Sequence, residues 1–173
     1  MTEVAVSLTA VREIYAPRDE GLKKVLKVTI HVRKNSLNTD GIHISNSNNI
    51  KIFHSTIGTE DDCTLIDGGT TNLWIEDIHY DPGYDISIQN SLRIKTWVTH
   101  YKFFVTDVIF QYILMENVKN DIQVDPMRYT RVSHLMHVKI NNVKYIDIHE
   151  SSATETALKF AYNDRNLCTK LKL

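Results

Sequence analysis

The 173-residue sequence has only two cysteines, Cys63 and Cys168, and no CxxC pair or local group of cysteines and histidines. The usual sequence patterns of a zinc site are therefore absent, and the two thiols could form at most one disulfide bond. His134 and His137 have a spacing that two metal ligands can share, but no third ligand lies near them in the sequence. We therefore expect neither a metal nor another cofactor.

An excess of charge of either sign is also absent, since 20 lysines and arginines stand against 21 aspartates and glutamates. Partners such as nucleic acid or a membrane surface are therefore not expected. No apolar run is long enough to span a membrane, and residues 1–8 include Glu3 and lack the basic start and apolar centre of a signal peptide. With three prolines and 42% hydrophobic residues, the sequence predicts one folded unit, which we expect to be a monomer.

A repeat of 22 or 23 residues is the main feature that the sequence does contain. Asp40, Asp62 and Tyr84 begin three similar segments, each 22 residues after the one before, and Asn49 and Asn72 begin two more that are 23 residues apart. Short strands of period two, separated by turns of Asn, Asp, Gly and Ser at this interval, predict an all-β parallel solenoid. Equivalent residues then stack at roughly 4.8 Å, so the first three should form a column and the two asparagines should bond along the stack.

The repeat indicates how the chain is organised. We expect a right-handed, single-stranded parallel β-helix over residues 21–173, incomplete at its N-terminal end, while residues 1–20 stay unassigned. An open solenoid end exposes apolar side chains and unpaired strand edges, which favours aggregation unless another segment covers it.

Four blocks of the sequence, in the same order, resemble the signature blocks of plant-type polygalacturonases. They read NTD at residues 38–40, EDDC at 60–63, PGYD at 82–85 and RIKTW at 93–97. The resemblance implies a pectin-degrading glycoside hydrolase with a pectin-lyase-like β-helix, active outside the cell or in the cell wall. Its substrate would be polygalacturonate or a pectin oligosaccharide, whose α-1,4 bonds such enzymes hydrolyse with inversion, without a cofactor.

The resemblance also implies roles for three acids. Asp61 would protonate the glycosidic oxygen as general acid, while Asp40 and Asp62 would activate the attacking water. Inverting enzymes commonly hold their two carboxyl groups about 6.5 to 9.5 Å apart, and repulsion within a group of carboxylates raises the pKa of one member. Taken alone, an aspartate in an Asn-Thr-Asp-Gly sequence is an ordinary turn residue, and that alternative stays open.

Three further residues match the substrate-binding positions of the family. Arg93 and Lys95 lie two apart in a predicted strand and therefore share a face, where they would hold the carboxylates of the substrate. Tyr129 matches a later tyrosine of the substrate site. The alternative for Arg93 and Lys95 is a charged strand face that covers a sheet edge.

Several positions depart from the family pattern. Tyr84 replaces the histidine of the Gly-His-Gly block, and a tyrosine hydroxyl, with a pKa of ~10, stays neutral where a histidine can carry a proton. Tyr80 and Tyr162 stand where the family has the cysteines that pair with Cys63 and Cys168, so both thiols should be free. These changes predict reduced activity and lower stability.

A deletion is the largest departure, because the family has about one further coil between residues 87–89 and 93–95. Successive parallel strands need a crossover of about a dozen residues, so the chain must bulge or merge two strands into one. A merged strand over 85–97 would place Arg93 and Lys95 roughly 30 Å from the acids. Two hypotheses follow: a polygalacturonase-type hydrolase with impaired activity, or a catalytically inactive relic that at most binds galacturonan.

Overall fold

The computed structural model describes residues 3–4, 7–8, 23–31, 40–81, 88–96, 103–126, 138–152, 158–160 and 167–173, and every regular element among them is a β-strand. No helix in this part of the chain has the length and apolar character needed to cross a membrane. The strands are β1 (Glu3–Val4), β2 (Ser7–Leu8), β3 (Lys23–Leu26), β4 (Thr29–His31), β5 (Ile42–Ile44), β6 (Asn48–Gly58), β7 (Asp62–Ile66), β8 (Thr70–Tyr80), β9 (Ile88–Thr96), β10 (Phe103–Pro126), β11 (Val138–Ser152), β12 (Leu158–Phe160) and β13 (Leu167–Lys172).

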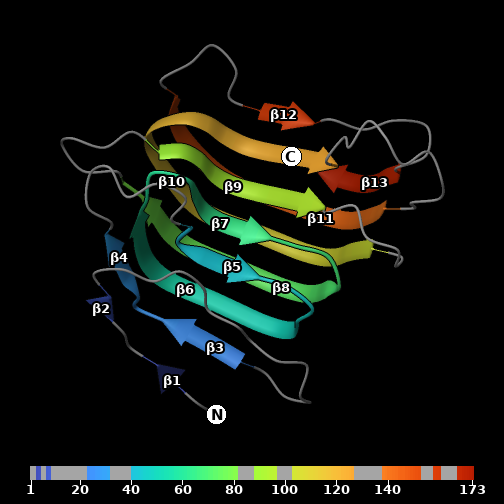
Figure 1. The fold of residues 1–173 in the computed structure, drawn as a ribbon, viewed down its shortest axis with the longest axis horizontal. Helices are drawn as coiled ribbons and strands as arrows, with labels where there is room; N and C mark the ends of the chain where they lie inside the picture. The colour runs from blue at the N-terminus through green and yellow to red at the C-terminus, as the bar shows by residue number, and fades with distance from the viewer. Residues whose placement is uncertain are drawn as a thin grey trace.

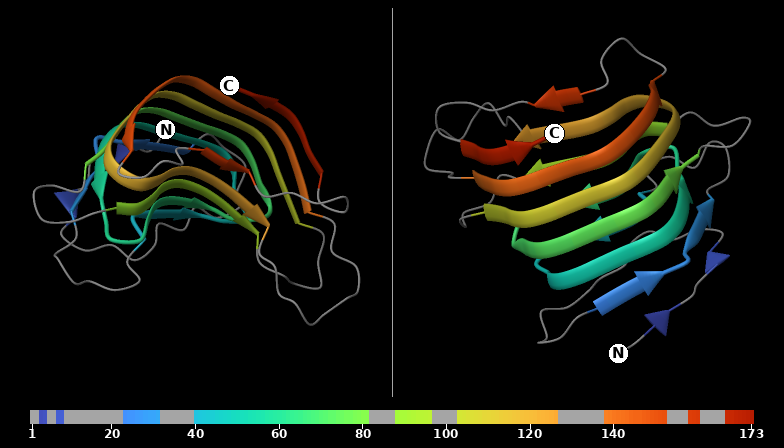
Figure 2. Two further views of the ribbon diagram at one scale, coloured as in Figure 1. Left: turned by 90° about the horizontal axis from the view of Figure 1, so that it is seen from above. Right: turned by 180° about the vertical axis from the view of Figure 1, so that it is seen from behind.

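These strands wind into successive coils, and each pairs in parallel with its counterpart one coil away. Along one wall the order is β3, β6, β8, β10, β11 and β13, and along another it is β5, β7, β9, the end of β10 and then β12. The stack rises from β1 at the bottom of Figure 1 to β12 at its top, and the views of Figure 2 show the coils lying one over another. The predicted parallel β-helix is confirmed. Both β1 and β2 lie within residues 1–20 and pair with β3 and β4, so they extend the stack.

The core of the solenoid consists of apolar columns, one residue from each coil. In one of them Ile52, Ile75, Phe110 and Tyr145 are in register and buried. The rings of Phe110 and Tyr145 stack with centroids 5.0 Å apart at an interplanar angle of 11°. Because burying each such side chain contributes about 1.5–3 kcal/mol, these columns hold neighbouring coils together.

Two columns of left-handed residues turn the long strands around the corners of the coil. All members have φ between 51° and 58°, and register places them in two stacks: Asn49, Asn72, Asp107, Asn142 and Lys170 in the first, and Lys27, His54, Asp77, Tyr112 and Asp147 in the second. Asn and Asp adopt this conformation more readily than other residues with a Cβ, which explains why the repeat places them there.

Side-chain amides bond along the first corner column. The Asn142 amide donates to Asp107 Oδ1 at 2.6 Å, and the Asn72 amide donates to Asn48 Oδ1 at 2.9 Å. The bond made by Asn72 therefore goes to the residue before Asn49, one position away from the pairing that the repeat predicts. Each bond joins two coils.

Candidate active site

Asp40 and Asp62 lie at the same position of two neighbouring coils. Asp40 stands two residues before β5, Asp62 begins β7, and Ile42 pairs with Thr64. The Gly41 amide donates to the carbonyl oxygen of Asp62 at 2.9 Å, so the backbone fixes this register up to the acids. A Cβ on Gly41 would lie 2.4 Å from the carbonyl oxygen of Cys63, which explains the glycine after Asp40. The 22-residue offset correctly predicts the pairing of these two coils.

Asp40, Asp61 and Asp62 form one cluster of carboxylates. One oxygen atom of each lies within 4.8 Å of the others, and the side chain of Asp62 is almost fully buried while the other two are partly exposed. This distance joins the closest oxygen atoms and is a different quantity from the separation of 6.5 to 9.5 Å between whole carboxyl groups of an inverting glycosidase. The closest oxygens approach the spacing of adjacent coils, which is the distance that stacking imposes.

Within this cluster the pKa of Asp40 is raised above its ordinary value of 3.8. Burial is the largest cause, followed by the negative charges of Asp62 and Asp61, while a backbone hydrogen bond and the nearby His43 act in the opposite direction. The predicted effect of like-charge repulsion is therefore present, but burial is the larger cause. Asp40 retains a proton to higher pH than an isolated aspartate does.

Asn90, and not Tyr84, lies opposite Asp62 on the next coil. The predicted column is therefore wrong at its third member, and Tyr84 itself falls outside the described residues. The reason is that six residues, 82–87, separate Asp81 from the start of β9, so the strand that pairs with β7 begins at Ile88. The repeat offset at this step is larger than 22 residues.

Arg93 reaches the acid cluster directly. Leu65 pairs with Arg93, and Arg93 Nη1 lies 3.3 and 3.4 Å from the two carboxylate oxygens of Asp62. The side chains of Arg93 and Asp62 are 16% and 2% exposed, so this ion pair is largely removed from water. The expectation that a merged strand carries Arg93 far from the acids is wrong, because β9 starts late enough to bring Arg93 three residues beyond the level of Asp62.

The remaining predicted substrate residues are less well placed by the structure. Lys95 lies in β9 and its backbone pairs with Asp125, but its side chain is not among those described. Tyr129 lies outside the described residues, as do His134 and His137. The structure therefore brings Arg93 to the three acids and leaves the positions of the other predicted contacts open.

His43 acts on Asp40 and lies beside Asp67, and neither His43 nor Asp67 was identified from the sequence. His43 Nε2 is 3.9 Å from Asp67 Oδ2, both side chains are 15% exposed, and His43 also acts on the pKa of Asp40. The available signal was the position of His43 in β5, since a polar residue between buried Ile42 and Ile44 must face outward from the core.

Both cysteines are free thiols, as predicted. Cys63 is fully buried; its Sγ accepts a hydrogen bond from Thr59 and donates one to the Ile57 carbonyl, and burial raises its pKa to about 12. Tyr80, which stands at the position of the missing cysteine partner, is also buried, and its hydroxyl is 2.8 Å from the Thr64 hydroxyl. The aromatic ring therefore fills part of the interior near a thiol that has no disulfide bond.

A sequence model of the family described as glycosyl hydrolases family 28 matches residues 20–89 and 88–173. The chain belongs to glycosyl hydrolases family 28. The two matched segments overlap at residues 88–89, next to the deletion that the sequence blocks predict. Membership of this family agrees with the parallel coils described above.

Relatives within family 28 include several plant proteins. A polygalacturonase of Prunus persica is 38% identical over 168 residues, which cover 80% of this chain and 43% of that protein. A polygalacturonase of Cryptomeria japonica is 32% identical, covering 89% and 35%, and an exopolygalacturonase of Arabidopsis thaliana is 31% identical, covering 80% and 38%. The chain thus spans less than half the length of these relatives.

Among solved structures, a polygalacturonase of Erwinia carotovora is similar with a TM-score of 0.46 and 18% sequence identity. The similarity covers 80% of this chain and 49% of that one.

Proposed function

We propose that this chain carries out polygalacturonase chemistry, the hydrolysis of α-1,4-galacturonosidic bonds in pectin or polygalacturonate in the cell wall. The observation that carries the proposal is the convergence of Asp40, Asp61 and Asp62, from two adjacent coils, within 4.8 Å. Family 28 membership and the names of the plant relatives support the choice of substrate. We expect the protein to act as a monomer, without nucleic acid or membrane as partner.

In this mechanism Asp61 donates a proton to the glycosidic oxygen, while Asp40 and Asp62 orient and deprotonate a water molecule. General acid catalysis needs one protonated carboxyl group beside ionised ones. The pKa of Asp40 is raised, partly by the charges of Asp62 and Asp61, which supports coupled protonation within this group. The oxygens of the three acids lie within 4.8 Å of one another, and Asp61 is the member that we propose transfers the proton.

Arg93 is the residue that we propose for binding a galacturonate carboxylate, with Lys95 and Tyr129 as further contacts. A guanidinium has five N–H donors, and only Nη1 of Arg93 contacts Asp62. A substrate carboxylate would therefore share Arg93 with Asp62 or displace it. This competition is expected to weaken substrate binding and is one physical reason to propose impaired activity.

The test is the release of reducing ends from polygalacturonic acid by purified protein at mildly acidic pH. The matched blank is Asp61→Asn, which preserves shape and removes the transferable proton; circular dichroism should establish that both proteins fold. We expect release by the parent to exceed that of Asp61→Asn by at least ~100-fold, the usual contribution of a general acid. Equal release from two folded proteins would contradict the proposal.

The alternative is a galacturonan-binding pseudoenzyme, and a specific observation favours it. The position opposite Asp62 is Asn90, an amide that cannot act as acid or base, and Arg93 is paired with a catalytic acid. On this alternative, isothermal titration with an oligogalacturonate detects binding without any release of reducing ends. Tyr84→His alone should then restore no activity, because the missing coil remains absent; full recovery in that variant would exclude the alternative.

A further inference from the structure

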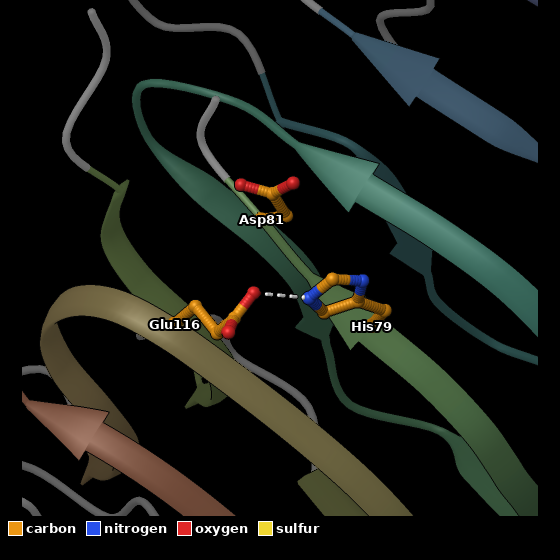
Figure 3. A group of neighbouring side chains, drawn as sticks. All are labelled: His79, Asp81 and Glu116. Carbon is orange, nitrogen blue, oxygen red and sulfur yellow. Dashed lines mark hydrogen bonds and ion pairs between the residues drawn. The ribbon is translucent and has the colours of Figure 1, made fainter. Parts of the chain in front are cut away.

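Three side chains with metal-binding groups converge on an outer wall of the solenoid. His79 and Asp81 lie two residues apart at the end of β8, so they point to the same side, and Glu116 comes from β10 on the next coil. Leu114 pairs with His79 and Met115 with Tyr80, which brings Glu116 level with Asp81. Figure 3 shows the three side chains projecting into one space between the two strands.

The distances between these groups approach those of a coordination site. One ligand atom of each residue lies within 4.8 Å of the others, and His79 Nε2 is 2.7 Å from Glu116 Oε2. Tetrahedral zinc with bonds of 2.0–2.2 Å places its ligands roughly 3.3 Å apart, so small side-chain rotations suffice. The side chains of His79 and Glu116 are 36% and 52% exposed, which leaves them room to rotate.

The group contains a third member besides the ion pair between His79 and Glu116. Asp81 adds a second carboxylate beside one imidazole, and this mixed nitrogen and oxygen set suits a divalent transition-metal ion such as zinc better than calcium or magnesium, which prefer oxygen ligands alone. This combination of ligands therefore points to a transition-metal ion more specifically than a group of acids alone would.

The neighbouring coil provides another imidazole close to this group. His31 pairs with Gly58, and Gly58 occupies the position equivalent to Asp81 on the coil before it. A Cβ at Gly58 would lie 2.1 Å from the Asp81 carbonyl oxygen and 3.4 Å from His31 Nδ1. Because Gly58 has no side chain, the ring of His31 lies directly beside the strand that carries Asp81.

We propose that His79, Asp81 and Glu116 bind one divalent transition-metal ion, with zinc as the preferred ion and water completing the coordination. The ion joins two coils through side chains, in addition to the backbone ladder between β8 and β10. Local spacing in the sequence does not reveal this site, because Glu116 is 35 residues from Asp81 and only the coil brings them together.

The test is isothermal titration of the metal-free protein with ZnCl₂, repeated with CoCl₂ while the visible absorption of bound cobalt is recorded. Asp40, Asp61 and Asp62 form a second cluster of ligand atoms, so all titrations use an Asp61→Asn background. His79→Ala and Glu116→Gln remove proposed ligands. His54→Ala is the matched control, since His54 also pairs with a carboxylate on the next coil, at 2.5 Å from Asp77, but no second acid among the described residues joins that pair.

We expect one zinc ion per chain in the Asp61→Asn protein. His79→Ala and Glu116→Gln should each weaken binding at least ~10-fold and change the cobalt spectrum, while His54→Ala leaves both unchanged. The proposal is overturned if millimolar zinc does not bind, if either ligand variant binds as tightly as the background protein, or if His54→Ala weakens binding equally. None of these results depends on glycosidase activity.

Discussion

Replacing Arg93 by methionine removes a buried counter-charge from the acid cluster. Arg93 Nη1 lies 3.3 Å from Asp62 Oδ1, and the Asp62 side chain is only 2% exposed, so water cannot take the place of the guanidinium without local opening. Breaking a buried ion pair by removing one partner costs about 3–5 kcal/mol. Because Arg93 retains 16% exposure, we expect the lower end of that range, about 3 kcal/mol.

The measurement is thermal unfolding followed by circular dichroism at neutral pH. In a chain of this length, 1 kcal/mol corresponds to a change of about 2–4 °C in Tm, so Arg93→Met should lower Tm by roughly 6–12 °C. The double variant Asp62→Asn with Arg93→Met removes both charges and should melt higher than Arg93→Met alone. A Tm for Arg93→Met within ~2 °C of the parent, or no recovery in the double variant, would refute the reasoning.

Three other predictions concern single side chains. Asp40 has a raised pKa, so folded-state stability should fall as pH rises from 3.8 through that pKa; Asp40→Asn should raise Tm at pH 7 but not at pH 3. Tyr112 is half exposed at φ 52°, and Tyr112→Asn should raise Tm by ~2–4 °C by relieving about 1 kcal/mol of backbone strain. Ellman's reagent should titrate one thiol, Cys168, in folded protein and two in denaturant, because Cys63 is buried with a pKa of about 12.

The parallel solenoid could be predicted from the sequence because stacked coils repeat the same local chemistry. Asp40 and Asp62 keep a constant offset, and left-handed corners select asparagine or aspartate at equivalent positions such as Asn49, Asn72 and Asn142. The offset could not be extrapolated to Tyr84, because the length of the connection before β9 is not fixed by the strands that it joins. A longer connection in one coil changes the residue number at which each later member of the column occurs.

Of the candidate site, the sequence predicts the acids but not their surroundings. Asp61 and Asp62 are adjacent and fall in register with Asp40, so their convergence follows from the repeat alone. The contact between Arg93 and Asp62 depends on the register between β7 and β9, which the 22-residue offset does not predict. The group around His79 depends on the same kind of long-range register and left no motif in the sequence.

The two left-handed columns also constrain how this fold can vary. The corners are five residues apart in every coil that contains both, from Asn49 to His54 and again from Asn142 to Asp147, whereas the first corner recurs at intervals of 23, 35, 35 and 28 residues. The wall between the two corners therefore has the same length, five residues, in each of these coils. The acids and Arg93 lie on the rest of the perimeter, where the number of residues differs from coil to coil, so changes there need not disturb the alignment of the coils at the corners.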